Sequence, residues 1–388
     1  ETGKPAGSAA GSVETAAQYF ELYGGLATAV NGEAINVGSG YHSYTRREPY
    51  GVVGVILPWN GPLAQAARSC APALAVGNVV VAKPSEATSG SLLALARMAL
   101  DCGLPAGVLN VVTGLGPEVG SAIVDHREIR KIAFTGSLRA GIEIGRAAAG
   151  RVVPLTLELG GKSPDIIFAD ADLDEAARGA VRGFLTNSGQ VCLSGTRILV
   201  QNSVGREVVE KIKAAMATYT LKDGERPLGP MVTRAQYEKV QAYWRIAKED
   251  GAVAEAGGTL PDPAGLGGGW FVSPTLYSGV DNRMRIAREE VFGPVACVIP
   301  FEDEAEAIAI ANDTDYGLAA GIWTRSLARA HRVAAALEAG QIYINEYMAG
   351  GVETPLGGYK LSGYGREKGI EALAFYTHLK CVTIRLPH

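Results

Sequence analysis

Cysteine and histidine are both scarce in this chain, and their spacing argues against several kinds of site. The 388 residues include five cysteines and five histidines, and no two cysteines form a Cys-x-x-Cys pair. A zinc site or a redox dithiol is therefore not expected, and we predict no metal site. Widely spaced cysteines in odd number instead predict free thiols in a reducing compartment.

The sequence also lacks a long apolar run and a cluster of basic residues. Apolar runs such as 76–82 are far shorter than the roughly 20 residues that a bilayer span needs. A formal net charge of −4 offers no positive field for nucleic acid. We expect a soluble, cytoplasmic protein without a membrane or nucleic-acid partner. Because the chain begins at Glu1, with no initiator Met or signal-peptide pattern, we also expect that an N-terminal segment is missing.

Short β-branched runs alternate with helix-like stretches along much of the chain. This rhythm predicts parallel strands joined by helices, as in doubly wound sheets that bind nucleotides. In the first block, strands are expected at 52–57, 78–82, 108–112, 131–134 and 155–159, and helices at 63–76, 89–102, 117–124 and 138–149. In the second block, strands are expected at 197–201, 295–300, 319–323 and 341–344, and helices at 172–189, 204–219 and 236–250.

Two segments fit neither block. Residues 31–50 resemble a β-hairpin, and 381–386 alternate like an edge strand. Solitary exposed strands invite association, so we expect these segments to pair with each other and with another subunit. The predicted fold class is α/β, with two doubly wound-type domains and a small β oligomerisation element. The expected division is a dinucleotide-binding domain at 1–30 and 51–160 (its N-terminal part absent), a catalytic domain at 161–361, and oligomerisation strands at 31–50 and 377–388.

Cys192 is the strongest candidate for a reactive residue. It follows the polar run Asn187-Ser188-Gly189-Gln190, which does not suit a packed core, whereas an ordinary buried cysteine is an inert small hydrophobe. A carboxylate that could accept a proton, Glu158, precedes the glycine pair Gly160-Gly161. A thiol and a carboxylate in glycine-lined turns suggest covalent catalysis through a thioester.

Polar groups also follow several of the expected strands, where ligands bind in open parallel sheets. Asn60 comes after the first strand and could donate to an oxyanion, or could simply be a turn residue. Lys83 and Glu86 follow the second strand and suit ribose hydroxyls, although Glu86 could also cap a helix. Ser137 stands at a helix start that could hold phosphate. The glycines around Gly116 miss the G-x-G-x-x-G spacing.

Taken together, these motifs resemble the aldehyde dehydrogenase superfamily. They occur in the family's order and cover essentially the whole chain: Pro58-Trp59-Asn60, Lys83-Pro84-Ser85-Glu86, Phe134-Thr135-Gly136-Ser137, 157–162, 189–192, 289–294, 355–363 and 365–368. The resemblance implies NAD-dependent oxidation of an aldehyde to the carboxylic acid, in a homodimer or homotetramer. NADP stays possible, although Glu86 disfavours a 2′-phosphate.

The resemblance also implies residue roles. Cys192 would be the nucleophile, Glu158 the base that activates water, and Asn60 an oxyanion donor. Lys83 with Glu86 would hold the adenosine ribose, and Glu290 with Phe292 the nicotinamide ribose. The full set of expected cofactor-binding residues is Ile56, Leu57, Pro58, Trp59, Lys83, Ser85, Glu86, Gly116, Gly120, Phe134, Gly136, Ser137, Leu159, Gln236, Lys239, Glu290 and Phe292.

The chain departs from the family's pattern where relatives often carry aromatic residues, at Gly61, Gly350 and Leu356. If these residues line the substrate tunnel, lost rings leave room for a bulky or long aldehyde, aromatic or terpenoid, unless neighbouring side chains fill the gaps. The expected tunnel residues are Gly61, Ala64, Gln65, Arg68, Val191, Leu193, Gly350 and Leu356.

Two alternatives stay open at this point. A catalytically silent structural or binding protein would share the fold, but would have no need for Cys192, Glu158 and Asn60 together. A cysteine-dependent esterase would use Cys192 without a cofactor.

Overall fold

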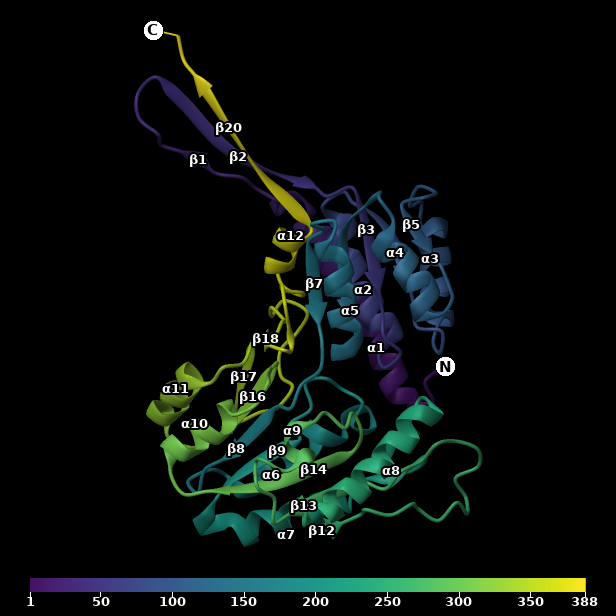
Figure 1. Ribbon diagram of the computed structural model, residues 1–388, viewed down its shortest axis with the longest axis vertical. Helices are drawn as coiled ribbons and strands as arrows, with labels where there is room; N and C mark the ends of the chain where they lie inside the picture. Colours follow the sequence, from purple (N-terminus) through teal and green to yellow (C-terminus); the bar gives the residue numbers. More distant parts are fainter. Residues whose placement is uncertain (388) are drawn as a thin grey trace.

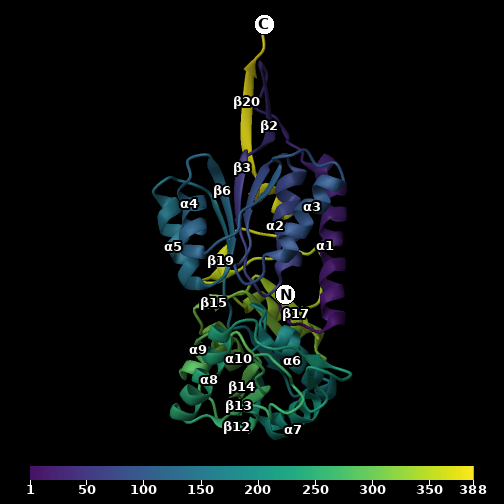
Figure 2. The same ribbon diagram turned by 90° about the vertical axis from the view of Figure 1, so that its right-hand side faces the viewer.

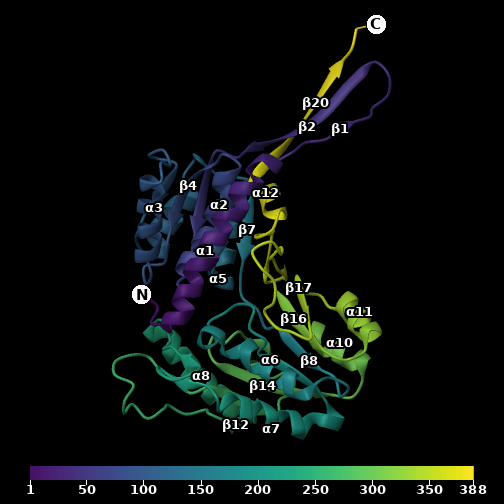
Figure 3. The ribbon, with the colours of Figure 1, turned by 180° about the vertical axis from the view of Figure 1, so that it is seen from behind.

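The computed structural model describes residues 1–387, in which two mainly parallel sheets lie one beyond the other along the length of the molecule (Figure 1). His388, the last residue of the expected oligomerisation strand, lies outside the described residues. A third, narrow sheet projects away from the first one (Figure 3).

The first sheet has six strands in the order β19-β7-β6-β3-β4-β5, all parallel except β19. The strands are β3 (Val52–Ile56), β4 (Val79–Lys83), β5 (Leu109–Val111), β6 (Ile129–Thr135), β7 (Leu155–Glu158) and β19 (Gly363–Tyr364). On one face lie α1 (Ala6–Leu26), α2 (Pro62–Ala75) and α3 (Gly90–Asp101), and on the other α4 (Ser121–Asp125) and α5 (Leu138–Ala149), as Figure 2 shows. The strand order therefore reverses direction beside β3, with β4 and β5 on one side of it and β6 and β7 on the other.

The second sheet has seven strands in the order β12-β13-β14-β9-β8-β16-β17, parallel except for β12. Its strands are β8 (Pro164–Ile167), β9 (Arg197–Gln201), β12 (Val253–Ala256), β13 (Thr275–Ser278), β14 (Val295–Phe301), β16 (Ala319–Trp323) and β17 (Gln341–Ile344). The helices of this half are α6 (Leu173–Leu185), α7 (Gly205–Met216), α8 (Arg234–Glu249), α9 (Arg285–Arg288), α10 (Glu304–Asn312) and α11 (Leu327–Ala336). Several begin at a side-chain cap, such as Asp172 on α6 and Thr233 on α8.

The projecting sheet consists of β1 (Ala34–Ile35), β2 (Tyr41–Pro49) and β20 (Thr377–Arg385), and α12 (Glu371–Phe375) precedes β20. Strands β2 and β20 pair antiparallel from Tyr41↔Arg385 to Pro49↔Thr377. The expected pairing of the hairpin with the C-terminal strand is thus present within one chain. Two short pairs complete the strands: β10 (Thr220–Leu221) with β11 (Pro227–Leu228), and β15 (Tyr316–Gly317) with β18 (Tyr359–Lys360).

Two local expectations were wrong in part. The helix expected at 117–124 begins as a π-helical turn, Gly116–Gly120, before α4. The helix expected at 172–189 ends at Leu185, and a turn over Thr186–Gly189 with left-handed backbone at Asn187 and Ser188 follows. The long helix α1 has no strong apolar period, yet its Tyr19 and Tyr23 are buried beside Ala67 of α2.

Candidate active site

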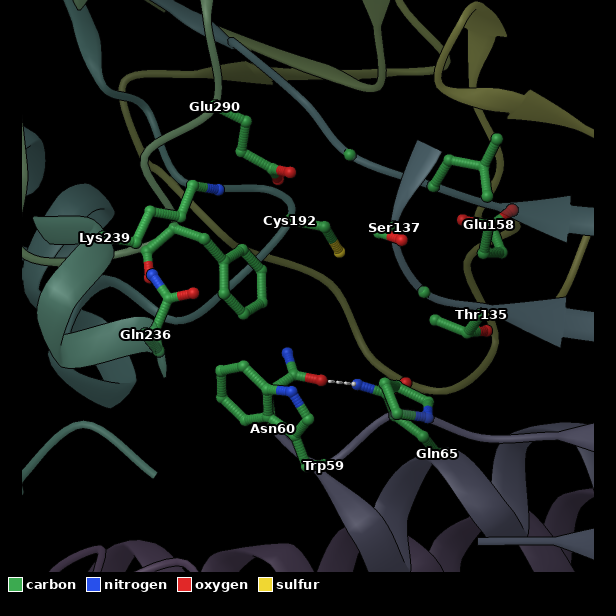
Figure 4. Close-up of a pocket in the computed structure, with 15 residues that line it drawn as sticks. Trp59, Asn60, Gln65, Thr135, Ser137, Glu158, Cys192, Gln236, Lys239 and Glu290 are labelled. Atoms are coloured by element: carbon green, nitrogen blue, oxygen red, sulfur yellow. Dashed lines mark hydrogen bonds between the residues drawn. The ribbon is translucent and has the colours of Figure 1, made fainter. Parts of the chain in front are cut away.

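A cavity of about 200 Å³ lies where the carboxyl ends of β3, β6 and β7 face the second half of the molecule (Figure 4). It contains most of the residues that the sequence marks as reactive. Its lining residues are Pro58, Trp59, Asn60, Gln65, Thr135, Gly136, Ser137, Glu158, Leu159, Gly160, Cys192, Gln236, Lys239, Glu290 and Phe292.

The turn before Cys192 has an unusual backbone. Asn187, Ser188 and Gly189 have φ values of 51°, 55° and 72°, three consecutive left-handed residues. A Cβ at Gly189 would lie 2.1 Å from the backbone oxygen of Gly293, so only glycine fits there. The Gln190 side chain braces the turn, because its Oε1 accepts from Val232 N at 3.0 Å and its Nε2 donates to Asn187 O at 3.2 Å. The loop that carries Cys192 is thus held by its own backbone and by Gln190.

Asn60 follows β3 and is tied directly to this loop. Its side-chain Nδ2 donates to the Gln190 backbone carbonyl at 2.9 Å, and its backbone carbonyl accepts from Asn187 Nδ2 at 3.0 Å. Gln65 Nε2, from the first turns of α2, donates to Asn60 Oδ1 at 2.9 Å. The Asn60 amide is buried and has a fixed orientation in the cavity wall.

Glu158 ends β7 and is 1% exposed. Among the described residues, no hydrogen-bond donor reaches either of its carboxylate oxygens. Burial raises the pKa of Glu158 to about 8, although the nearby Arg68 guanidinium partly offsets this effect. A carboxyl with a pKa near neutrality is suited to accept and release a proton.

The Cys192 thiol shares the cavity with Glu158 and Glu290 (Figure 4). Burial raises the pKa of Cys192 to about 12; Arg68 lowers it and the two carboxylates raise it further. The thiol is therefore protonated at neutral pH, and attack on an electrophile requires transfer of its proton to a base. Glu158 and Glu290 are the two carboxylates that line the same cavity.

The other part of the cavity fits a dinucleotide. It lies at the point where the strand order reverses, between the ends of β3 and β6. Ser137 caps α5 there, and a helix N-terminus favours phosphate. The Glu290 carboxylate is positioned by Gly161 N at 3.1 Å, and it is the kind of acceptor that ribose hydroxyls bind. A Cβ at Gly160 would lie 2.5 Å from Glu290 Oε2, so this contact needs glycine.

Several expected cofactor residues lie outside the cavity lining. Lys83 ends β4, where its Nζ lies 3.6 Å from Glu86 Oε2, and Gly120 is close to the Lys83 side chain. The others that do not line it are Ile56, Leu57, Ser85, Gly116 and Phe134. Lys83 is the last residue of β4 and Glu86 follows it, and β4 lies beside β3 in parallel. These two side chains therefore lie at the same edge of the sheet as the cavity.

Of the eight expected tunnel residues, only Gln65 lines the cavity. Gly61 lies beneath Gln65, Leu356 is 3% exposed and pairs through its backbone with Glu367, and Gly350 faces Thr354. The remaining residues that do not line the cavity are Ala64, Arg68, Val191 and Leu193.

Arg68, one of the expected tunnel residues outside the cavity lining, is held in a buried ion pair. Its guanidinium forms an ion pair with the buried Glu367 carboxylate and donates to Thr135 Oγ1 at 2.9 Å. Sequence reasoning did not give Glu367 or Thr135 a role, although both belong to motifs that carried the resemblance. A charged pair separated by about three hundred positions leaves no local signal.

The fold and the cavity together define an α/β protein of the nucleotide-binding type, with a cysteine in the wall of its cavity. Residues 1–382 match the profile of the Aldehyde dehydrogenase family, and the chain belongs to this family. It therefore oxidises aldehydes.

Similar proteins cover nearly the whole chain. A betaine aldehyde dehydrogenase from Mesorhizobium japonicum is 47% identical over 373 residues, which make up 95% of this chain and 76% of that protein. The solved NAD+ complex of an aldehyde dehydrogenase from Bacillus cereus is 42% identical, with a TM-score of 0.96, covering 100% of this chain and 79% of that one. An NAD-dependent aldehyde dehydrogenase from Sinorhizobium meliloti is 39% identical, with a TM-score of 0.96, covering 100% and 77%.

Within the described residues, no helix is long and apolar enough to cross a membrane. The same part of the chain holds no group of three or more side chains suited to a metal ion.

Proposed function

We propose that this chain oxidises an aldehyde to the carboxylic acid through a thioester on Cys192, with NAD as its cofactor and Glu158 as the base. One observation carries the proposal: Cys192, Glu158 and Asn60 line a single cavity together with Ser137, Glu290 and other residues that fit a dinucleotide. The NAD+ complex of the similar Bacillus cereus enzyme supports this cofactor.

In the first step the Cys192 sulfur adds to the aldehyde carbon while the thiol proton passes to a base. The carbonyl oxygen becomes an oxyanion, and the Asn60 Nδ2 hydrogen that is not bonded to Gln190 O stabilises it. Such a donor contributes about 3–4 kcal/mol to the transition state. The chemistry that NAD supplies when bound is acceptance of the hydride that leaves this adduct, which turns the adduct into a thioester.

Hydrolysis then releases the product. The Glu158 carboxylate takes a proton from water, the hydroxide adds to the thioester carbon, and the carbon–sulfur bond breaks. The acid departs, and the thiolate of Cys192 takes up a proton. Among the described residues, both Glu158 oxygens are buried and lack a hydrogen-bond donor, so each retains its capacity to accept a hydrogen bond from a water in the cavity.

The expectation of a bulky or aromatic substrate stays a prediction, and its original basis is weaker. Leu356 and Gly350 lie outside the cavity lining, and Gln65 fills the space above Gly61. The relative from Mesorhizobium japonicum is named for betaine aldehyde, whose quaternary ammonium is a group that aromatic cages bind. Here the aromatic lining residues are Trp59 and Phe292, with ring centroids 5.4 Å apart.

The same proposal includes the association of subunits and the cellular compartment of the protein. The β1-β2-β20 sheet projects from the body and exposes apolar side chains, which suits a homodimer or homotetramer (Figure 1). All five cysteines, which lie among residues 1–387, are free, which suits the cytoplasm.

An NADH-release assay over aliphatic, aromatic and amino-aldehydes tests the proposal and ranks the substrates. Cys192→Ala should abolish NADH formation, whereas Cys102→Ala, at an exposed cysteine, is the matched control and should retain it. Aldehyde oxidation that survives in the Cys192→Ala variant would overturn the assignment of the nucleophile.

A further inference from the structure

Gln65 lies in the cavity wall and bonds to the residue assigned as the oxyanion donor (Figure 4). Its Nε2 donates to Asn60 Oδ1 at 2.9 Å, and this is the contact drawn as a dashed line in the figure. The direction of this bond decides what Gln65 does for Asn60.

The backbone carbonyl of Gln190 fixes that direction. The backbone carbonyl of Gln190 can only accept a hydrogen bond, so the Asn60 group that faces it at 2.9 Å must be the NH₂. The Asn60 oxygen therefore faces Gln65, which must present its own NH₂ in return. Neither amide can be turned over without losing a hydrogen bond.

Gly61 leaves room for this contact. A Cβ at Gly61 would lie 3.1 Å from Gln65 Nε2 and 3.4 Å from Gln65 Cγ. Gly61 has a φ of −148°, which is not the left-handed conformation that favours glycine. The space above Gly61 is instead the space that the Gln65 side chain needs to reach Asn60.

We propose that Gln65 is a positioning residue for the oxyanion donor, and that Gly61 and Gln65 act as a unit. The bond from Gln65 keeps Asn60 Oδ1 away from the developing oxyanion and leaves the second Nδ2 hydrogen of Asn60 available to it. It also polarises the Asn60 amide, which makes its N–H groups better donors. This inference rests on the proposed reaction at Cys192.

Two nearly isosteric substitutions separate hydrogen-bond polarity from packing. Gln65→Met keeps the volume and removes the donor, so Asn60 loses its restraint, and kcat should fall about tenfold. Gln65→Glu replaces the donor with an acceptor that competes for Asn60 Nδ2, and kcat should fall about a hundredfold. In both variants KM should change much less than kcat, because the interaction acts on the oxyanion rather than on the bound aldehyde.

A double-mutant cycle tests the unit. Gly61→Val should displace Gln65 and lower kcat in the wild-type background, but should have little further effect after Gln65→Met. Thermal unfolding of each variant is measured alongside, and the cycle carries the test if Gln65→Glu does not fold.

The results distinguish failure of the inference from failure of the proposed reaction. Wild-type protein that forms no NADH from any aldehyde would contradict the reaction itself. Active wild type with Gln65→Met and Gln65→Glu both within about twofold in kcat would overturn the role of Gln65. Equal losses in the two variants, in parallel with lowered unfolding temperatures, would show packing alone and would also overturn it.

Discussion

Arg68 and Glu367 form a buried ion pair behind the cavity, close enough to Glu158 for both charges to act on its carboxyl. Arg68 lowers the pKa of Glu158, and Glu367 raises it, while burial has the largest effect. Arg68 also lowers the pKa of the Cys192 thiol. The pair thus influences the protonation of the two groups to which we assign the chemistry, without lining the cavity itself.

The pH dependence of turnover should follow Glu158. Its pKa is raised to about 8, and only the ionised carboxylate can take a proton from water. We therefore expect kcat to rise with pH and to level off above about 8, provided that thioester hydrolysis limits the rate. The measurement is the pH profile of NADH formation at saturating aldehyde and NAD. Glu158→Gln should lose the rising limb and accumulate a thioester visible in the intact mass. Steady-state turnover near wild type in this variant, with no thioester, would exclude Glu158 as the base.

Removal of Arg68 should shift the pH range over which kcat rises. Arg68→Met takes away the charge that favours ionised Glu158, so the rise in kcat should shift to higher pH. It also leaves Glu367 without its partner, which should destabilise the fold by about 3–5 kcal/mol. Adding Glu367→Gln should recover part of that loss and move the limb back toward its wild-type position.

The comparison of the single and double variants is its own control. Both lack the Arg68 side chain, so lost packing is common to them, and only the unpaired Glu367 charge differs. Equal stability and equal pH profiles in the two variants would show that the ion pair has no electrostatic influence on Glu158.

Much of the first half of the fold follows from local sequence. Runs such as 52–56 and 79–83 are β-branched and end at polar motifs, so both the strands and the edge that carries Asn60 were predictable. Arg68 was not. It lies on the buried face of α2 among small residues, and its partner Glu367 comes from the far end of the chain. A local pattern could not distinguish a tunnel position from a core ion pair.

Gly61 illustrates the same limit. Its lack of a side chain predicted an enlarged tunnel, but the space belongs to Gln65, four residues further along the helix. Which side chain fills a gap depends on rotamers and on partners such as Asn60, and these are set only in the folded chain.

Glu158 should reduce the stability of the fold as the pH rises. Its pKa is raised from 4.5 to about 8 on folding, so the folded state disfavours the ionised form. This effect is absent below the pKa that Glu158 has in the unfolded chain. The loss of stability begins above that pKa and grows with pH as long as the folded protein keeps Glu158 protonated. Glu158→Gln cannot ionise and should therefore be more stable than wild type by about 1–3 kcal/mol at neutral pH.

Urea unfolding at acidic and alkaline pH checks this prediction. The difference between Glu158→Gln and wild type should be small near about pH 4 and should widen toward about pH 8. A difference that does not vary with pH would mean that packing or solvation of the amide, rather than ionisation of Glu158, separates the two proteins.

The projecting sheet should hold subunits together. Leu379 and Ile384 of β20 are 61% and 44% exposed in the single chain, on a sheet that extends away from the body (Figure 1). Leu379 and Ile384 lie on opposite faces of the strand, so Leu379→Arg with Ile384→Lys places a charge on each face. The double substitution should shift the protein toward monomer, because burying an unpaired charge in an interface is costly. Light scattering coupled to gel filtration measures the mass. Leu327→Arg, at a leucine of α11 that is 74% exposed, is the control and should leave the mass unchanged. A wild-type protein that is already monomeric at micromolar concentration would contradict the association itself. A doubly substituted protein that keeps its mass would place the subunit contact elsewhere.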